Sequence, residues 1–264
     1  MPDGGEALLV EVAARLAEVP AADWDRCAGD ENPFVSHAFL SALEESGAVT
    51  PETGWMPQHL LLRDGAGELL GCAPFYVKGH SHGEYIFDYA WADAYERAGG
   101  QYYPKLLSAV PFTPVTGPRL LLGPGGDAAI GTAALANGAQ QLAQKYQLSG
   151  LHLNFLPADQ AEALGGQGFS LRYGHQFHWE NRGYGDFEDF LADLTSRKRK
   201  AIRKERRKVS EAGLELLCLS GDEIEERHWD AFFHFYIDTY DRKWGSPYMN
   251  RDTFRRFHDS LRER

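Results

Sequence analysis

The sequence predicts a mixed α/β (α+β) fold, and three observations support this prediction. Short apolar runs alternate with amphipathic stretches: "ALLVEVAARL" (7–16) predicts a strand and "VSHAFLSALEESG" (35–47) predicts a helix. The stretch 58–78 holds two apolar runs around Asp-Gly-Ala-Gly, a pattern typical of a β-hairpin. A strand, a glycine-rich loop, a helix and a second strand follow between residues 117 and 157.

The first helix has recognisable ends. We expect Ser36 to cap its N-terminus, because a serine hydroxyl accepts hydrogen bonds from the first free N–H groups, and Gly47 to end it. Further along the chain, the apolar pattern predicts strands at 117–124 and 150–157, a helix at 132–147, and one long strand or a strand pair at 170–181.

These elements divide the chain into an N-terminal segment at 1–185, a helical connector at 186–213 and a third segment at 214–264. The connector changes from acidic to basic along its length, which suits the helix macrodipole, and it ends at Gly213. The third segment consists of a predicted strand at 214–220 and helices at 222–245 and 250–264. Two helices alone do not cover the apolar side of such a strand, so we expect the sequence to be a truncated part of a longer protein.

Composition indicates a folded protein, since 43% of the residues are hydrophobic. No apolar run approaches the roughly 20 residues of a membrane-spanning helix. The acidic N-terminus does not have the pattern of a signal peptide. The three scattered cysteines, Cys27, Cys72 and Cys218, fit a reducing compartment better than a disulfide framework. We therefore expect a cytoplasmic protein.

Charge is distributed unevenly along the chain. The net charge is −11, yet "RKRKAIRKERRK" (197–208) holds nine of the 27 basic residues and one of the 38 acidic ones. The remaining 18 basic and 37 acidic residues give a net charge of −19. Three interpretations stay open for this helix: a solvated charged face, contact with RNA phosphates, or contact with a diphosphate-bearing acceptor. The candidates for anion contact are Arg203, Lys204, Arg206 and Arg207.

The stretch "KGHSHGEYIFDYAWADAY" (78–95) concentrates ionisable and aromatic residues. In an extended strand, its alternation predicts a polar face of His80, His82, Glu84 and Asp88 opposite a packed aromatic face of Tyr85, Phe87, Tyr89 and Trp91. A metal site, an acid–base cluster and the wall of a substrate pocket are three interpretations of the polar face. Nothing else in the chain completes a ligand set, so we expect no metal.

Two further stretches have the composition of binding segments. In "LLLGPGGDAAIGTAAL" (120–135), the backbone N–H groups of Gly123, Gly125 and Gly126 precede a helix and predict a phosphate cradle, with an ordinary loop as the alternative. The proline-rich "YYPKLLSAVPFTPVTGPRL" (102–120) predicts a rigid wall that lines a site, with core packing of its tyrosines as the alternative.

The stretches at 34–47, 78–95 and 102–120 resemble the bacterial FemAB-like proteins, which are predicted N-acyltransferases among the GNAT-fold acyltransferases. The helix at 196–208 and the "GLELLCL" after it are similar to the basic helix and second half of Fem transferases that build peptidoglycan bridges. The resemblance implies two tandem GNAT-like halves, of which this chain holds the first and the start of the second. It also implies a co-substrate, acyl-CoA or the aminoacyl-tRNA that Fem transferases use, and no tightly bound cofactor.

Acyl transfer from an activated donor requires an aligned, neutral amine and removal of a proton. The candidates for the base are Glu84, Asp88 and Asp93, because burial among aromatic rings raises a carboxylate's pKa, and then His80 and His82. Lys78, Lys105 and Arg119 are candidate anchors for phosphate or carboxylate groups. The other candidates for substrate contact are Tyr89, Trp91, Tyr95, Tyr102, Tyr103 and Thr113.

We therefore expect an N-acyltransferase that moves an acyl or aminoacyl group to an amine acceptor, for example a peptidoglycan precursor. The alternative is a catalytically inactive GNAT-like module that binds RNA, such as tRNA, or another partner through helix 197–208. Salt dependence distinguishes the two, because contacts with phosphates weaken steeply as salt rises.

Overall fold

The computed structural model describes residues 8–243 and 245–263. Contacts gather these residues into two compact units. The larger unit holds the described residues up to Arg172 and from Gly221 onwards, and the smaller unit is Tyr173–Ser220. Helices and strands are mixed in the larger unit, which confirms the predicted mixed α+β class. The domain boundaries proposed at 185/186 and 213/214 stay a prediction.

The first sheet of the larger unit is antiparallel throughout, in the order β1-β3-β4-β7. Its strands are β1 (Leu9–Ala13), β3 (His59–Arg63), β4 (Leu69–Ala73) and β7 (Leu121–Leu122). The predicted hairpin is confirmed as β3 and β4. Its turn is held by Asp64, whose Oδ1 accepts hydrogen bonds from the N–H groups of Ala66 (3.0 Å) and Glu68 (2.8 Å).

The second sheet has the order β2-β5-β6-β8. Its strands are β2 (Trp55–Pro57), β5 (Tyr76–Lys78), β6 (Lys105–Ser108) and β8 (Leu151–Leu153). The strands β6 and β8 pair in parallel, whereas the other pairs are antiparallel. Only Pro74 and Phe75 separate β4 from β5, so the chain passes directly from one sheet to the other.

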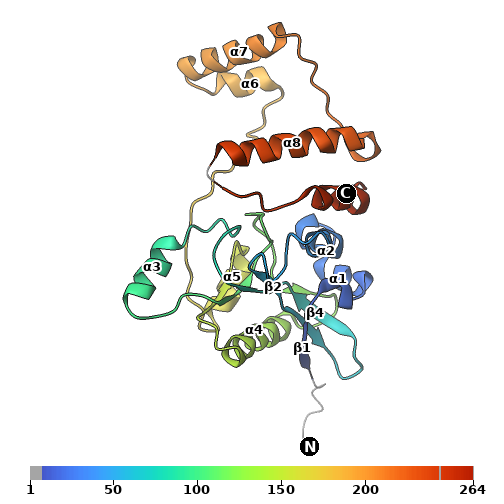
Figure 1. Cartoon of the computed structure of the whole chain (residues 1–264), viewed down its shortest axis with the longest axis vertical. Helices are drawn as coiled ribbons and strands as arrows, with labels where there is room; N and C mark the ends of the chain where they lie inside the picture. Colours follow the sequence, from blue (N-terminus) through green and yellow to red (C-terminus); the bar gives the residue numbers. More distant parts are fainter. Residues whose placement is uncertain (1–7, 244, 264) are drawn as a thin grey trace, which may run out of the picture. The chain divides into compact units, whose positions relative to one another are not determined.

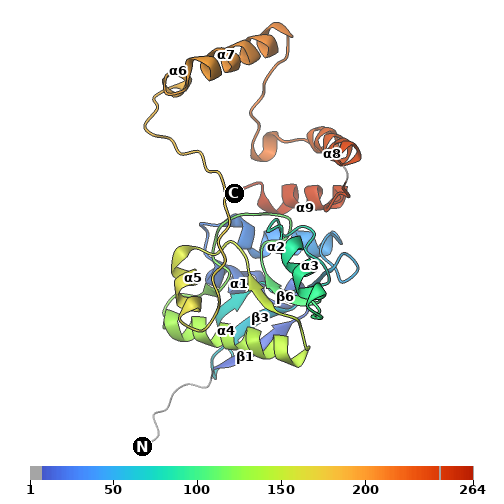
Figure 2. The ribbon, with the colours of Figure 1, turned by 90° about the vertical axis from the view of Figure 1, so that its left-hand side faces the viewer.

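Two apolar cores lie on the two faces of the first sheet, and Figures 1 and 2 show helices over both of these faces. Leu61 of β3 packs into the core that contains Trp24 of α1 (Ala21–Ala28) and Leu40 of α2 (His37–Glu45). Its neighbours Leu60 and Leu62 pack on the other side, in the core made with α4 (Ala128–Lys145) and α5 (Ala158–Gly165). This alternation is the one that a strand buried on both faces requires.

The helix ends predicted for α2 are confirmed. Ser36 is the N-cap, and its Oγ accepts a hydrogen bond from the N–H of Phe39 at 3.3 Å. Gly47, two residues after the helix ends, has φ of +77°. Short 3₁₀ helices at Leu16–Glu18 and Pro33–Val35 precede α1 and α2, and a third lies at Gly221–Glu223.

The C-terminal helices α8 (Glu226–Arg242) and α9 (Arg251–Leu261) belong to the larger unit. On α9, the ring of Phe257 stacks on Phe39 of α2, with ring centroids 4.8 Å apart. Just before α9, Tyr248 stacks in the same way on Phe112, at 5.1 Å. The helices predicted at 222–245 and 250–264 are therefore present within the described residues, and α9 completes the core on the α2 side.

The smaller unit consists of irregular segments around two helices, α6 (Phe187–Ala192) and α7 (Ser196–Glu211). The region predicted as helical, 186–213, holds both helices, and they are separated by a short break at Asp193–Thr195. Asp186 caps α6, accepting a hydrogen bond from the N–H of Asp189 at 2.9 Å. Gly213 follows α7 with φ of +66°, as a glycine that ends a helix does.

Two predicted strands are wrong. Residues 170–181 and 214–220 have no regular secondary structure. An extended segment becomes a strand only when another segment satisfies its backbone groups, and within the described ranges no strand pairs with either of them. None of the described helices is both long and apolar enough to cross a membrane.

Candidate functional site

The stretch 78–95 is not one extended strand, which corrects the sequence-based prediction. Strand β5 ends at Lys78, residues 79–88 form an irregular loop, and α3 runs from Tyr89 to Arg97. Gly83 has φ of +80°, and Tyr85 and Phe87 also adopt left-handed backbone conformations, with φ of +59° and +50°. These turns destroy the two-residue period, so His80, His82 and Glu84 do not share a strand face.

The loop separates the candidate bases from one another. The side chains of Glu84 and Asp88 are fully buried, whereas Asp93 lies exposed on α3 in an ion pair with Arg97 at 3.0 Å. His82 is exposed, and the half-buried ring of His80 lies 4.7 Å from it. Among the five candidates, Glu84 and Asp88 therefore come together in the interior, while the two histidine rings contact each other nearer the surface.

Two buried lysines face these carboxylates. Lys78 on β5 and Lys105 on β6 are register partners, and both are 0% exposed. The ammonium of Lys105 donates hydrogen bonds to Glu84 Oε2 at 2.9 Å and to Asp88 Oδ2 at 2.8 Å. We call Lys78, Glu84, Asp88 and Lys105 the buried quartet.

Three hydroxyl groups surround the quartet. Ser81 Oγ accepts a hydrogen bond from Lys105 at 3.0 Å and lies 2.7 Å from the hydroxyl of Tyr103. Tyr102 donates its hydroxyl to Asp88 Oδ2 at 2.8 Å. Burial and this hydrogen bond raise the pKa of Tyr102, so the phenol keeps its proton and remains a donor.

Lys78 is held by its surroundings and does not reach solvent. Its ammonium lies 3.7 Å from the ring centroid of Trp55 and donates a hydrogen bond to the carbonyl of His82 at 3.2 Å. Burial is the main cause that lowers the pKa of Lys78 to about 7; the charge of Glu84 opposes this shift and that of Lys105 adds to it. The role of Lys78 as an anchor for a phosphate or carboxylate group stays a prediction, and its side chain lies in the interior.

The two carboxylates of the quartet are shifted in opposite directions. Burial raises the pKa of Glu84, against the opposing attraction of Lys105. Burial acts in the same sense on Asp88, but hydrogen bonds from Lys105 and Ser81 outweigh it and lower that pKa. A pair of carboxyl groups with diverging pKa values is the usual arrangement for dividing proton transfer from charge stabilisation.

Each carboxylate also has a free oxygen. Glu84 Oε1 and Asp88 Oδ1 are buried and have no hydrogen-bond partner among the described residues. A buried carboxylate oxygen without a donor is costly, so such atoms point to a missing partner. An amine or ammonium group donates several hydrogen bonds and is the kind of partner that such oxygens lack. His152 on β8 lies nearby as a neutral ring, since burial, together with Lys105, lowers its pKa to about 4.

The aromatic residues of 85–91 lie on the surface, not packed against the core as predicted. Phe87 is 73% exposed, Trp91 is 62% exposed and Tyr89 is 53% exposed. The guanidinium of Arg172 lies 5.1 Å from the ring centroid of Trp91. Tyr95 is also exposed, and it contacts the half-buried Tyr102 edge to face, with ring centroids 6.2 Å apart.

Two residues of the predicted wall, Arg119 and Thr113, form hydrogen bonds within their own loop. The guanidinium of Arg119 is fully buried and donates hydrogen bonds to the carbonyls of Val115, Gly117 and Pro118. It therefore holds the loop 115–119 in place. The hydroxyl of Thr113 donates to the carbonyl of Pro111 at 3.2 Å. Within the described residues, no hydrogen bond or ion pair joins Arg119 or Thr113 to the quartet.

The glycine loop leads into α4, which begins at Ala128, four residues earlier than predicted. Gly125 has φ of +90°, and Gly125 and Gly126 are exposed, while Gly123 is half-buried. The helix start is capped by Asp127, whose Oδ1 accepts hydrogen bonds from the N–H groups of Ala129 (2.8 Å) and Ile130 (3.1 Å). A carboxylate therefore occupies N–H groups that a phosphate would use.

The four candidate anion contacts of α7 point in different directions. Arg203 forms an ion pair with Glu188, and the guanidinium of Arg206 lies 4.2 Å from the ring centroid of Phe187, both on α6. Lys204 and Arg207 are exposed and have no partner among the described residues. Only these last two are free to meet an anion.

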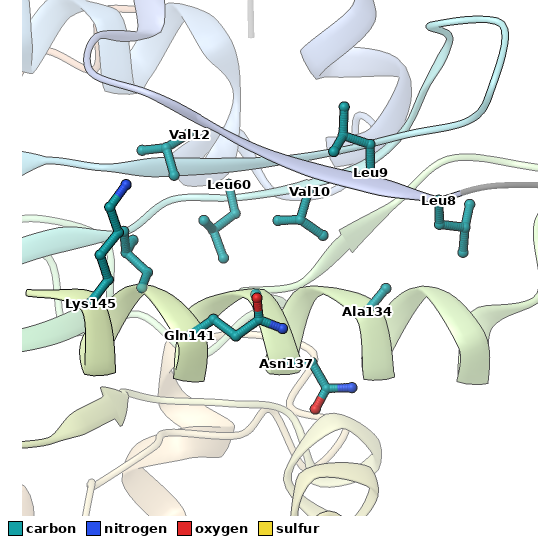
Figure 3. A pocket seen from close by; sticks show the side chains of 11 residues that line it. Leu8, Leu9, Val10, Val12, Leu60, Ala134, Asn137, Gln141 and Lys145 are labelled. Atoms are coloured by element: carbon teal, nitrogen blue, oxygen red, sulfur yellow. The ribbon is translucent and has the colours of Figure 1, made fainter.

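A groove of about 620 Å³ lies between β1 and α4 (Figure 3). Leu8, Val10 and Leu60 line it from the sheet side, and Gln141 and Lys145 from the helix side. None of the predicted site residues lines this groove. In the described part of the chain, no three His, Cys, Asp or Glu side chains are grouped so that they could hold a metal ion.

Sequence reasoning missed Ser81, Trp55 and His152, and it did not predict that the candidate anchors Lys78 and Lys105 are buried. One signal was available. Lys78 ends the apolar run "APFYVK" and Lys105 begins "KLLS", so each lysine continues a buried strand. A lysine next to such a run is rarely buried unless carboxylates pair with it, and Glu84 and Asp88 lie between the two lysines in the sequence.

The fold and the buried quartet define a mixed α+β protein with a cluster of two lysines and two carboxylates in its interior. The profile of the FemAB-like family, described as peptidoglycan biosynthesis/recognition, matches residues 15–264. The chain belongs to this family. No curated protein matches the chain.

Several solved structures are similar to this chain. A ribosomal-protein-alanine N-acetyltransferase from Brucella melitensis biovar Abortus 2308 is 14% identical, with a TM-score of 0.40, and the match covers 66% of this chain and 99% of that one. An aminoglycoside antibiotic 6'-N-acetyltransferase from Acinetobacter baumannii is 10% identical, with a TM-score of 0.37 and coverage of 68% and 100%. A GNAT family N-acetyltransferase from Escherichia coli, in complex with CoA, is 14% identical, with a TM-score of 0.30 and coverage of 55% and 61%. TM-scores this low do not establish a shared fold.

Proposed function

We propose that this protein is an N-acyltransferase. It moves an acyl or aminoacyl group from an activated donor to an amine acceptor, and the FemAB-like family favours a peptidoglycan precursor as the source of that amine. The observation that carries the proposal is the pair Glu84 and Asp88, buried side by side, with pKa values shifted in opposite directions and one free oxygen on each.

The two carboxylates divide the work on the amine. An acceptor amine reaches the site as an ammonium group, and Glu84 takes one proton from it, because burial raises the pKa of Glu84 and makes this carboxylate a stronger base. Asp88 stays ionised and holds the nitrogen through its free oxygen. Lys105 fixes both carboxylates and is a positioning residue, since its ammonium bonds both of them.

The neutral amine then attacks the carbonyl carbon of the donor. A bond forms between nitrogen and carbon, and the bond from that carbon to the leaving group breaks. The leaving group is the thiolate of coenzyme A or the ribose oxygen of tRNA, and it accepts the second proton of the amine. Alignment of the two reactants supplies much of the rate in such a reaction.

The donor is proposed to bind at the loop 123–127, which leads into α4. A Cβ atom on Gly125 or Gly126 would meet nothing within 4 Å, which leaves room for a phosphate there, whereas Gly123 packs closely against Leu70 and Cys27. Asp127 opposes an anion at this place, since its carboxylate caps the helix. The proposal therefore keeps both acyl-CoA and aminoacyl-tRNA as donors. Both occur in the cytoplasm, which is the proposed location of the reaction.

The tandem arrangement is part of the same proposal. Residues 1–185 are proposed as one GNAT-like half, 186–213 as a basic helical connector and 214–264 as the start of a second half. The FemAB-like profile, which runs continuously over residues 15–264, is consistent with this organisation.

Substitution of Glu84 tests the function. The variant Glu84→Gln keeps the shape and removes the base, so kcat for acyl transfer should fall by about 10²–10⁴-fold while KM for the donor changes little. The control is Asp93→Asn, on the exposed face of α3, which should leave kcat unchanged. Full activity of Glu84→Gln with both donor classes would refute the base, and absence of transfer by the wild-type protein would refute the function.

The alternative function, a catalytically inactive module that binds RNA or a partner, is favoured by the unpartnered cations of α7. It makes a different prediction. Glu84→Gln would then have no phenotype, and neutralising Lys204 and Arg207 would abolish binding of the partner.

A further inference from the structure

Helix α7 carries its cations on two faces. The arginines of one face already have partners within the same unit. Arg203 pairs with Glu188, the guanidinium of Arg206 lies over the ring of Phe187, and Arg199 donates a hydrogen bond to the carbonyl of Leu194 at 3.3 Å. These three arginines hold α7 to α6 and to the turn between them. Figure 1 shows α6 next to α7, in agreement with these contacts.

The other face is an unpartnered row of cations. At 100° per residue, five cations fall within a sector of about 100° and extend for about 16 Å along the axis. We call them the open stripe: Arg197, Lys200, Lys204, Arg207 and Lys208. All five are exposed, and none has an ion pair or hydrogen bond among the described residues. The half-buried residues of α7, Arg199 and Ile202, lie outside this sector.

The open stripe is unfavourable in isolation. Neighbouring members are three or four residues apart, as in Lys200 and Lys204, and like charges at that spacing repel each other on a helix. The repulsion is relieved when an anionic surface lies along the stripe. The rest of the chain outside 197–208 has a net charge of −19 and is repelled by such a surface, so contact is confined to this face.

We propose that the open stripe docks this protein on an anionic membrane surface, a role separate from the transfer reaction. The stripe follows a straight line on one helix, so a flat layer of lipid headgroups meets all five cations at once. After α7, in the same unit, Leu214, Leu216 and Leu217 are 63%, 81% and 66% exposed in an irregular segment. Leucines beside a basic helix insert into the boundary between headgroups and acyl chains.

Nucleic acid fits these observations less well. The open stripe contains no aromatic side chain on which a base could stack. Phosphate contact also gives no reason for three neighbouring exposed leucines, because apolar side chains do not contribute to counterion release. RNA binding is therefore the outcome that would replace this proposal.

The test compares two triple variants of equal charge change in the full-length chain. The stripe variant, Lys200→Gln with Lys204→Gln and Arg207→Gln, neutralises three of the five stripe cations. The control variant, Arg199→Gln with Arg203→Gln and Arg206→Gln, neutralises the three arginines that contact α6 and the turn. Binding is measured by co-sedimentation with vesicles of 3:1 phosphatidylcholine and phosphatidylglycerol. The stripe variant should bind about hundredfold more weakly, and the control variant within about threefold of wild type. Equal loss in both variants would show that only net charge matters and would overturn the proposal.

Four further measurements keep the result interpretable. Circular dichroism shows whether each variant keeps its helices. If the control variant unfolds, vesicle binding by the wild-type protein alone tests the proposal. The wild type should bind these vesicles at low salt and lose binding as salt rises, and it should not bind vesicles of pure phosphatidylcholine. Leu214→Ser with Leu216→Ser and Leu217→Ser should weaken vesicle binding severalfold. Binding to tRNA with no binding to anionic vesicles would refute the membrane and establish RNA as the partner.

Discussion

Lys78 and Lys105 lie directly opposite each other on the antiparallel strands β5 and β6, and neither side chain reaches solvent. Like charges in this position destabilise a sheet. Here the loop 79–88 folds back and brings Glu84 and Asp88 onto Lys105, while Lys78 lies against Trp55. The lysine pair therefore fixes the place of the loop, and the loop places the candidate base.

Removing Lys105 should destabilise the protein strongly. In Lys105→Met, both carboxylates keep their burial and lose their cation, and breaking a buried ion pair from one side costs about 3–5 kcal/mol. Urea denaturation monitored by circular dichroism measures the free energy of unfolding. The control, Arg97→Met, breaks only the exposed ion pair with Asp93 and should change stability little. A small loss of stability in Lys105→Met would mean that water reaches the quartet and that its charges are not buried.

Lys78 should make stability rise with pH. Its pKa is about 7 in the folded protein, below the ordinary value of 10.5, so the unfolded chain binds more protons between these two values. The free energy of unfolding should therefore increase from pH 7 towards pH 10, relative to Lys78→Met, which lacks the titrating group. Denaturation midpoints of both proteins across this range provide the measurement. Parallel pH profiles would contradict a lowered pKa at Lys78.

Gly83 should be intolerant of a side chain. It has φ of +80°, and a Cβ atom there would lie 2.7 Å from Cδ1 of Phe112. Gly83→Ala should therefore lose about 1–3 kcal/mol of stability and reduce acyl transfer, because the loop that carries Glu84 shifts. Gly65→Ala, where a Cβ atom meets nothing within 4 Å, is the matched control for thermal unfolding. Similar melting temperatures for the two variants would contradict the contact.

Phe257 should contribute to the stability of the larger unit. Phe257→Ala loses the stacking on Phe39 and opens the core between α9 and α2, at a cost of about 2 kcal/mol, below that of a fully buried phenylalanine. Phe235→Ala on α8, where the ring is 66% exposed, should have little effect. Urea denaturation of both variants decides whether α9 is part of the cooperative core.

Asp127 should weaken the binding of a phosphorylated donor. Asp127→Asn keeps an N-cap for α4 and removes the negative charge, so the KM for acyl-CoA should fall about threefold to tenfold if its diphosphate binds at the loop 123–127. Thermal stabilisation by free coenzyme A gives an independent readout. An unchanged KM together with unchanged stabilisation would place the donor elsewhere.

Local signals predicted much of the fold, and long-range contacts explain the rest. The hairpin turn at Asp64 and the cap at Ser36 depend on residues within four positions, which the sequence displays. The quartet joins residues 17 and 21 positions apart, and no sequence period marks them. The left-handed conformations of Tyr85 and Phe87 also had no signal, because aromatic residues seldom adopt them. That loop is where the predicted strand failed.

The stacking of Tyr248 on Phe112 has a consequence for synthesis on the ribosome. These two rings are 136 residues apart in the sequence, and residues 173–220, which form their own unit, are made in between. At a translation rate of about 5–20 residues per second, Tyr248 is synthesised roughly 7–27 seconds after Phe112. During this interval the nascent chain displays an uncovered aromatic surface, so the emerging protein should be a client of ribosome-associated chaperones.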